Sequence, residues 1–401
     1  MTTSYASAEL LHEDLDTLLR TVRRHLHQYP EIGFHEVHTH RYLREVLELH
    51  GLTVHGPLAR TGLYADIEGD ADGPLIAYRS DIDALPTQDE KNVEYRSTVS
   101  GVAHLCGHDA HSAIALGIAL LLNERRASLP GTVRVFFQPN EEGIPSGAPA
   151  MIEDGVLEGV SAVFASHVDP TLSTGVYGLI SGPATASADQ FTIRVRGHAS
   201  GHSARPHQST DTVWIMSQIM SVLYQTVGRQ SDARDTAIIS ICRMIGGDAF
   251  NVIPASAEIG GTLRCISNDE RRVLQERMEH TARSIGRMHG AQVDVEFDTG
   301  SPPVYNNPEL VSLVREVLLD TNGPDAIFEI PRPSMGGEDF AHYLQRVPGM
   351  LLRVGTSNGP ATSYPLHDSC FDVDEEAIPL AARVLADVLE EALQQAPKGG
   401  S

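Results

Sequence analysis

The chain of 401 residues contains few cysteines, namely Cys106, Cys242, Cys265 and Cys370. Their positions do not form the regular framework of a disulfide-rich secreted domain. So few cysteines in a chain of this length are typical of a reducing compartment. The N-terminal segment carries early acidic residues and no apolar core, which argues against a signal peptide. These two observations predict a cytoplasmic protein.

Long apolar runs and positive charge are also scarce. The longest apolar run, AIALGIALLL at residues 113–122, is far shorter than the roughly 20 residues that span a bilayer, so it predicts a buried helix. Lysine and arginine number 30 against 53 aspartates and glutamates, which gives a net charge of −23. Such an acidic surface repels phosphate, which excludes nucleic acid and anionic membranes as partners.

Hydrophobic residues make up 41% of the chain and charged residues 21%, which is typical of a soluble globular protein. The length suggests about two domains. Apolar runs predict strands at 74–83, 132–139, 161–167 and 349–356 and helices at 7–28, 112–126 and 375–395. Strands that alternate with helices in this way predict an α/β fold with a mostly parallel sheet.

The pattern changes between residues 187 and 298. Alternating segments predict strands at 190–197, 236–247, 256–265 and 291–298, and helical segments lie at 210–228 and 268–290. The order β-α-β-β-α-β is that of a ferredoxin-like domain. We therefore expect this α+β domain, residues 187–298, to be inserted into a discontinuous catalytic domain formed by residues 1–186 and 299–401.

Several polar residues follow the predicted strands. The carboxyl ends of parallel strands meet at one edge of a sheet, where such folds bind ligands. The residues placed there are Asp81, Asp83, Cys106, His108, Asn140, Glu141, Glu142, His167 and His367. A set of cysteine, histidine and glutamate side chains suits one or two transition metals of the zinc type. Because a helix is predicted just after Cys106, we also expect a lowered thiol pKa there.

A cysteine nucleophile is the competing interpretation of the stretch HLCGHDAH at residues 104–111. Cys106 and one of the histidines His104, His108 or His111 would then form a nucleophile–base pair. That pair leaves Glu141, Glu142, His167 and His367 without a role, whereas a metal site uses all of them. Spacing alone leaves both interpretations open.

Seven ordered motifs resemble the M20 metallopeptidases, and specifically their amidohydrolase branch of aminoacylases, hippurate hydrolases and auxin-conjugate hydrolases. An N-terminal segment, RRHLHQYPEIGFHE, also looks like the signature of this family. The motifs are RSDIDALP, HLCGHDAHSA, FFQPNEEG, SGHSARPH, NVIP with GTLR, MGGEDF and PLHDSCFD. They span nearly the whole chain.

The resemblance implies a two-metal centre. Cys106 would bridge both ions, His108 and His167 would complete one site, and Glu142 and His367 the other. Glu141 would be the general base, and Asp81 a supporting carboxylate. Arg79 stands where the wider superfamily has a metal histidine, and His108 would substitute for it.

The inserted domain resembles the family's lid, which often also forms its dimer interface. In that case His202 would reach the substrate carbonyl, and Asn251 and Arg264 would bind the substrate carboxylate. The motif around His202 is one residue longer than usual and offers His198 as a second candidate. Near His367 the sequence departs from the family by placing Cys370 close to the centre.

The resemblance implies hydrolysis of small-molecule N-acyl amino acids by a homodimer that pairs through the lid. Two divalent ions per subunit are expected, with zinc favoured by the thiolate and manganese, cobalt or nickel as alternatives. A dipeptidase or carboxypeptidase with the same centre is the second hypothesis. A catalytically silent binding protein is the third, and the presence of every expected ligand and of the base argues against it.

Overall fold

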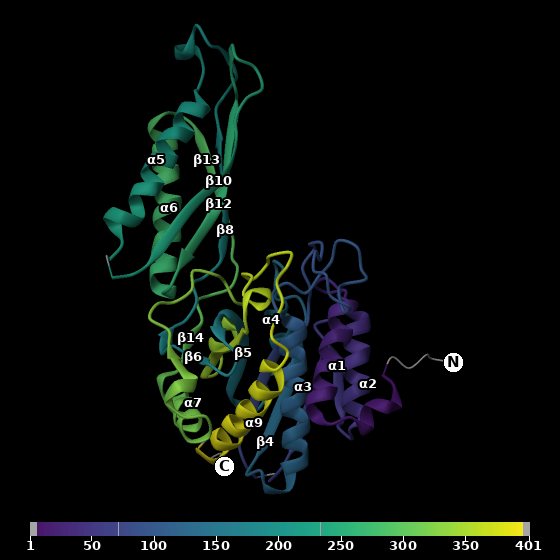
Figure 1. Cartoon of the computed structure of the whole chain (residues 1–401). Helices are drawn as coiled ribbons and strands as arrows, with labels where there is room; N and C mark the ends of the chain where they lie inside the picture. The colour runs from purple at the N-terminus through teal and green to yellow at the C-terminus, as the bar shows by residue number, and fades with distance from the viewer. Residues whose placement is uncertain (1–5, 71, 233, 396–401) are drawn as a thin grey trace. The chain divides into compact units, whose positions relative to one another are not determined.

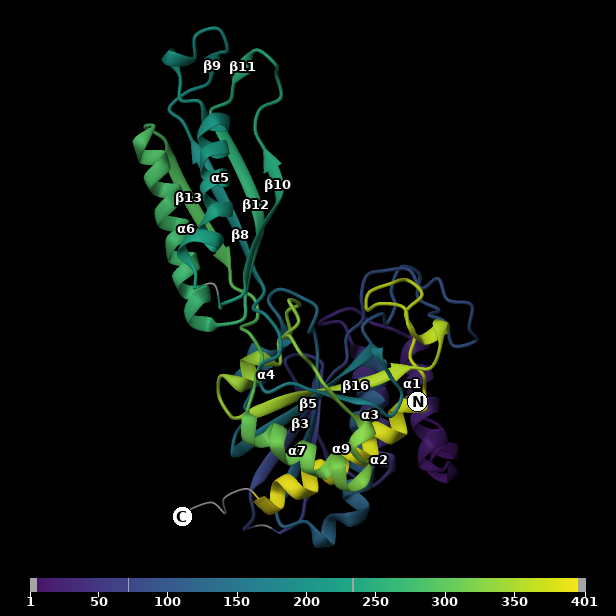
Figure 2. The same ribbon diagram turned by 60° about the vertical axis from the view of Figure 1, so that its left-hand side comes forward.

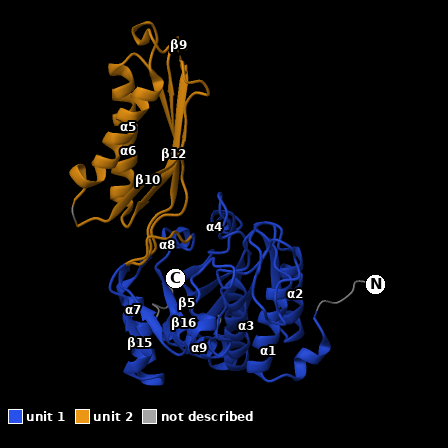
Figure 3. Ribbon diagram, turned by 45° about the horizontal axis from the view of Figure 1, so that its top comes forward, with its two compact units in different colours: residues 1–182, 305–332, 339–401 blue, residues 183–304, 333–338 orange. Residues whose placement is uncertain are grey.

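The computed structural model describes residues 6–70, 72–232 and 234–395. These residues form two compact units (Figure 3). The first comprises residues 1–182, 305–332 and 339–401, and the second residues 183–304 and 333–338. The segment 333–338 lies outside the range we expected for the inserted domain. It joins the second unit because Ser334 donates a backbone hydrogen bond to Ala184, and Ala186 donates one to Gly336.

The first unit is built on an eight-stranded sheet (Figures 1 and 2). Its order is β1 (Val54–Leu58), β2 (Gly62–Glu68), β4 (Thr132–Gln138), β3 (Leu75–Asp81), β5 (Val160–Ser173), β16 (Gly349–Ser357), β6 (Tyr177–Leu179) and β15 (Ile327–Glu329). The central strands β4, β3, β5 and β16 are parallel to their neighbours within this group. The predicted α/β architecture with a mostly parallel sheet is confirmed.

Burial explains why the central strands could be read from the sequence. In β3 every residue from Ile76 to Asp81 is buried, and in β4 every residue from Val133 to Gln138 is buried. Parallel strands that are covered on both faces are rich in apolar residues, such as LIAY in β3 and VFF in β4, and here polar residues follow at their carboxyl ends. The helices of this unit are α1 (Leu15–Gln28), α2 (Val37–Leu49), α3 (His108–Arg125), α4 (Gly147–Glu153), α7 (Pro308–Thr321), α8 (Ala341–Leu344) and α9 (Ala377–Gln395).

Helix α3 is the centre of the hydrophobic core and packs against α1, α9 and strand β3. It is buried almost all round, and Gly117 lets it approach Leu19 of α1 and Ala382 of α9 closely. The N-terminal end of α3 therefore has a fixed position relative to the sheet, which matters because Cys106 and His108 lie there.

Two predicted elements differ from the observed ones. The helix expected at 7–28 is broken into a 3₁₀ turn, Ala8–His12, and α1. The break occurs because the Asp14 carboxylate accepts a hydrogen bond from the backbone N–H of Thr17 at 3.1 Å and caps α1. The helix expected at 112–126 begins earlier, at His108. Four polar residues at its start are buried, so the pattern of apolar residues does not reveal this start.

The second unit has an antiparallel sheet in the order β10 (Ala237–Ile245), β12 (Ser256–Cys265), β8 (Asp189–Arg196) and β13 (Gln292–Asp298). Helices α5 (Thr212–Gln230) and α6 (Asn268–Met288) pack on the same face of this sheet (Figures 1 and 2). This topology is that of a ferredoxin-like fold. Short strands β9 (Gly201–His202) and β11 (Val252–Ile253) pair outside it. The role of this unit as a lid or dimer interface stays a prediction.

The two-residue strands β7 (Gly182–Pro183) and β14 (Tyr305–Asn306) pair with each other where the chain passes from one unit to the next. Within the described ranges, we find no helix with the length and apolar character needed to cross a lipid bilayer.

Candidate metal centre

Cys106 and His108 are held at the start of α3 by a tight turn at Gly107. Gly107 caps the helix with φ +88° in the left-handed region, where L side chains are strained. A Cβ atom at this position would lie 2.4 Å from the Val168 side chain. Glycine therefore satisfies two requirements at once, the backbone conformation and the close approach of the turn to β5.

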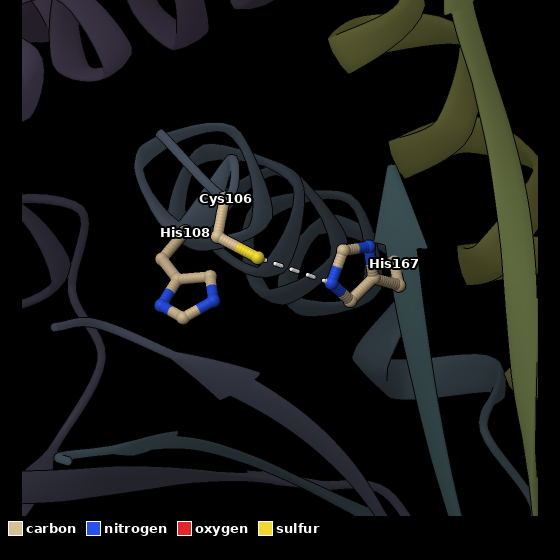
Figure 4. Close-up of side chains that lie close together, drawn as sticks. All are labelled: Cys106, His108 and His167. Carbon is tan, nitrogen blue, oxygen red and sulfur yellow. Dashed lines mark hydrogen bonds between the residues drawn. The ribbon is translucent and has the colours of Figure 1, made fainter. Parts of the chain in front are cut away.

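His167 faces Cys106 from strand β5 (Figure 4). Its Nε2 lies 3.5 Å from the Cys106 Sγ atom, and its Nδ1 donates to the backbone carbonyl of Val168 at 2.8 Å. Burial, with a smaller contribution from Arg353, lowers the pKa of His167 well below its usual range. The ring is thus neutral and presents the lone pair of Nε2 toward the cysteine, which is the form that binds a metal ion.

His108 completes this group from the first turn of α3. Its Nδ1 donates to the Asp83 carbonyl at 2.9 Å, and its buried Nε2 makes no hydrogen bond within the described chain. Burial disfavours the protonated ring, but Asp81 and Asp83 outweigh it and raise the pKa of His108 well above its usual range. Ligand atoms of Cys106, His108 and His167 all lie within 4.8 Å of one another. Without a metal the Asp81 and Asp83 carboxylates favour a proton on the ring, and a cation held at the unbonded Nε2 would take the place of that proton.

Glu142 and His367 form a second group with the same cysteine. Ligand atoms of Cys106, Glu142 and His367 lie within 4.8 Å of one another, and Nε2 of His367 is 3.2 Å from Oε1 of Glu142. This close contact with the Glu142 carboxylate raises the pKa of His367. The loop after β16 places His367, because the backbone N–H of His367 donates to the carbonyl of Leu105 at 2.8 Å. Cys106 is thus common to both groups.

Glu141 lies beside these groups, since ligand atoms of His108, Glu141 and Glu142 are also within 4.8 Å of one another. The turn that carries both glutamates follows β4 at Asn140, whose φ is +53°. The buried Glu36 carboxylate accepts the backbone N–H of Asn140 at 2.9 Å, and Asp83 accepts that of Glu142 at 3.1 Å. Two buried carboxylates therefore hold this turn in place.

The expectation of a lowered thiol pKa at Cys106 is wrong for the chain by itself. Cys106 is only 7% exposed, and burial, followed by the nearby Glu142 carboxylate, raises the pKa of its thiol well above the usual range. These two effects outweigh the start of helix α3. A bound cation would supply the positive charge that a buried thiolate needs here.

Asp81 and His111 belong to a further cluster with His108. Both ring nitrogens of His111 are already used, because Nδ1 lies 2.7 Å from Asp81 Oδ1 and Nε2 accepts the N–H of Val168 at 2.9 Å. His111 is therefore a supporting residue and not an open ligand. From the sequence His111 is only a possible base for Cys106, and its position one helical turn after His108 is the one signal of a supporting role.

The three residues expected to contact substrate all lie in the second unit. The β9–β11 pairing brings His202 and Asn251 close together, since Val252 pairs with His202 and Ser203 donates a backbone hydrogen bond to Asn251. Arg264 lies on another element, strand β12. His198, the second candidate for the position of His202, has its Nδ1 2.6 Å from the Thr210 hydroxyl.

Comparison with known proteins identifies the family. Residues 77–391 match peptidase family M20/M25/M40. An N-acetylcysteine deacetylase of Bacillus subtilis (strain 168) is 39% identical over 93% of this chain and 96% of its own length. Thermostable carboxypeptidase 1 of Saccharolobus solfataricus is 36% identical over 92% of this chain and 94% of its own.

A solved structure agrees with these two relatives. It is a Bacillus subtilis protein described as a dinuclear metal binding peptidase of the M20 family, and it is 36% identical to this chain. The two align over 95% of this chain and 99% of the other, with a TM-score of 0.84. The sequence, the fold and the relatives agree, and the chain belongs to peptidase family M20/M25/M40.

Proposed function

We propose that this enzyme hydrolyses N-acyl amino acids to a carboxylic acid and a free amino acid. The observation that carries the proposal is the position of Cys106, which is shared by two groups of ligand atoms. One buried sulfur between two such groups suits a centre of two divalent ions. The similarity to an N-acetylcysteine deacetylase supports an amide substrate of this class.

In this proposal Cys106, His108 and His167 would hold one ion, and Cys106, Glu142 and His367 would hold the other. Sulfur and nitrogen ligands favour zinc, with manganese, cobalt and nickel as alternatives. When bound, such ions lower the pKa of a water molecule and polarise an amide carbonyl. The supporting carboxylate is Asp81, which lies 3.6 Å from Nε2 of His108.

Glu141 is the general base of the proposal. Its carboxylate takes a proton from the attacking water and later returns it to the nitrogen of the leaving amine. The backbone N–H of Asp339 lies 3.4 Å from Oε1 of Glu141 and orients the carboxylate. The side chain is only partly buried, so it can reach both water and substrate.

The second unit provides the substrate contacts of the proposal. His202 would stabilise the oxyanion that forms during attack on the amide. Asn251 and Arg264 would bind the free α-carboxylate, for which the planar guanidinium of arginine offers two parallel hydrogen bonds. These three roles rest on the match to the motifs SGHSARPH, NVIP and GTLR.

A carboxypeptidase or dipeptidase with the same centre is the second candidate. The 36% identity to thermostable carboxypeptidase 1 favours it. The two activities share the metal ligands and the base and differ only in the acyl group, which is an aminoacyl or peptidyl group in a peptidase. A substrate series separates them.

Metal removal tests the proposed chemistry. We expect two divalent ions per chain by elemental analysis, loss of hydrolysis after chelation, and recovery when zinc or manganese is added back. The substrates are N-acetyl and N-benzoyl amino acids, with dipeptides of the same C-terminal residue for comparison. Activity that survives chelation and is abolished by a thiol reagent would show that Cys106 is a nucleophile instead.

We also propose that the enzyme is a homodimer through its second unit. Strand β10 is an edge strand of the antiparallel sheet, and its side chains Ile238, Met244 and Ile245 are 41%, 47% and 51% exposed. An edge strand with exposed apolar residues is suited to pairing with a second copy. Sedimentation analysis should give a dimer for the wild type and a monomer for Met244→Asp. A wild-type monomer at micromolar concentration would refute the proposal.

A further inference from the structure

Arg79 is a buried cation next to the candidate centre. It lies on β3 with 1% of its surface exposed, and its partners include Gln138, Asp81 and Asp339. Its Nε donates to Gln138 Oε1 at 2.8 Å, its Nη1 to Asp81 Oδ2 at 2.7 Å, and its Nη2 to Asp339 Oδ1 at 2.7 Å. A buried guanidinium with two carboxylates 2.7 Å away is held in one geometry, and it fixes the orientation of both carboxylates in turn.

The first of these carboxylates leads toward His167. The other oxygen of Asp81, Oδ1, lies 2.7 Å from Nδ1 of His111. On the far side of the ring, Nε2 of His111 is 2.9 Å from the backbone nitrogen of Val168. A backbone N–H only donates, so Nε2 carries no proton and Nδ1 donates to Asp81. This chain of hydrogen bonds ends on the residue that follows His167, and it fixes the middle of β5 beside that histidine.

The second carboxylate leads toward Glu141. Oδ2 of Asp339 accepts hydrogen bonds from the Gln138 side chain at 2.7 Å and from the backbone N–H of Ala148 at 3.1 Å. The backbone N–H of the same Asp339 lies 3.4 Å from Oε1 of Glu141. Arg79 therefore connects two chains of hydrogen bonds. One ends beside the candidate ligand His167, and the other ends at the candidate base Glu141.

We propose that Arg79 and His111 are positioning residues. Through Asp81 they hold His167 close to Cys106, and through Asp339 Arg79 holds Glu141 in place. The set Arg79, Asp81, His111 and Asp339 is called the buried relay below. This inference rests on the proposed metal centre and adds residues that neither bind the ions nor contact substrate. Replacing residues that support the metal ligands in this way typically lowers metal affinity or activity about 10–100-fold.

The test measures how tightly the purified holoenzyme retains zinc against increasing concentrations of a chromophoric chelator. We expect Arg79→Gln and His111→Leu to retain zinc about 10–100-fold more weakly than the wild type. His111→Gln should recover most of the affinity, because a side-chain amide also offers one donor and one acceptor. The His111 pair keeps the proposal testable if Arg79→Gln does not fold.

Arg134→Gln is the matched control. Arg134 lies on the neighbouring strand β4, is 8% exposed, and pairs with Asp66 at 2.8 Å, outside all the ligand groups. It should lose thermal stability and keep the zinc affinity of the wild type. The proposal fails if the relay variants retain zinc as the wild type does, or if Arg134→Gln weakens binding as much as Arg79→Gln. It also fails if His111→Gln and His111→Leu are equally impaired.

This readout does not involve substrate. If the wild type binds two zinc ions and cleaves no N-acyl amino acid, the proposed activity is wrong, and the relay is still tested by the zinc affinities. If the wild type binds none of zinc, manganese, cobalt and nickel, both proposals are overturned.

Discussion

Glu141→Gln should lower kcat by about 10²–10⁴-fold or more and leave both metal ions in place, because general acid–base catalysis contributes on this scale. The substitution removes the ability to accept a proton and keeps the shape of the side chain. The amide can still accept the Asp339 N–H that lies 3.4 Å from Oε1. The measurements are steady-state kinetics on an N-acyl amino acid and metal content per chain.

The neighbouring glutamate provides the contrast. Glu142 lies in the ligand group with Cys106 and His367, and its Oε1 is 3.2 Å from Nε2 of His367. Glu142→Gln should therefore lower the metal content as well as the rate. Near-normal turnover in Glu141→Gln, or loss of metal in that variant equal to that in Glu142→Gln, would contradict the separation of base and ligand.

Cys106→Ala should abolish activity and remove both ions, because the sulfur belongs to both ligand groups. Replacing a residue that only supports a metal ligand lowers metal affinity or activity about 10–100-fold. For the shared ligand itself we therefore expect metal affinity and activity to fall by more than about 100-fold. Elemental analysis of the purified variant measures the metal, and activity at saturating zinc shows whether added metal compensates.

Cys265→Ala is the matched control for this variant. Cys265 is fully buried, but it lies in the core of the second unit and in none of the ligand groups. Its removal should change stability and not metal content. If Cys106→Ala retains one ion per chain and measurable hydrolysis, the sulfur is a ligand to a single ion, and the bridging role is wrong.

The central strands and the helices of the core could be predicted from the sequence, since β3 and β4 contain the apolar runs LIAY and VFF. The edge strand β1 and its antiparallel neighbour β2 were not predicted. In β1 the residues between Val54 and Leu58 are exposed, so the strand has no periodic apolar signal. The expected start of α3, at residue 112, is too late because the residues before it are polar and yet buried. His108, Asp109, His111 and Ser112 are all buried despite their polarity, because each has partners within the fold.

The candidate ligands were identified from ordered motifs, while their spacing alone left a cysteine nucleophile open. The structure adds that Cys106, His108, His167, Glu142 and His367 form two groups that share one atom. The buried relay could not be predicted. His111 and Val168 are 57 residues apart in the sequence, and Arg79 and Asp339 are 260 apart, so only the folded sheet brings them together.

Gly107 and Gly101 have similar backbone angles and very different neighbours. Gly101 has φ +75° and no atom within 4 Å of an added Cβ, whereas Gly107 has φ +88° and the Val168 side chain at 2.4 Å. During evolution asparagine or aspartate can replace Gly101, because both tolerate the left-handed region. At Gly107 any side chain must also displace β5, next to His167. Position 101 can therefore change in sequence, while the residue between Cys106 and His108 must remain glycine.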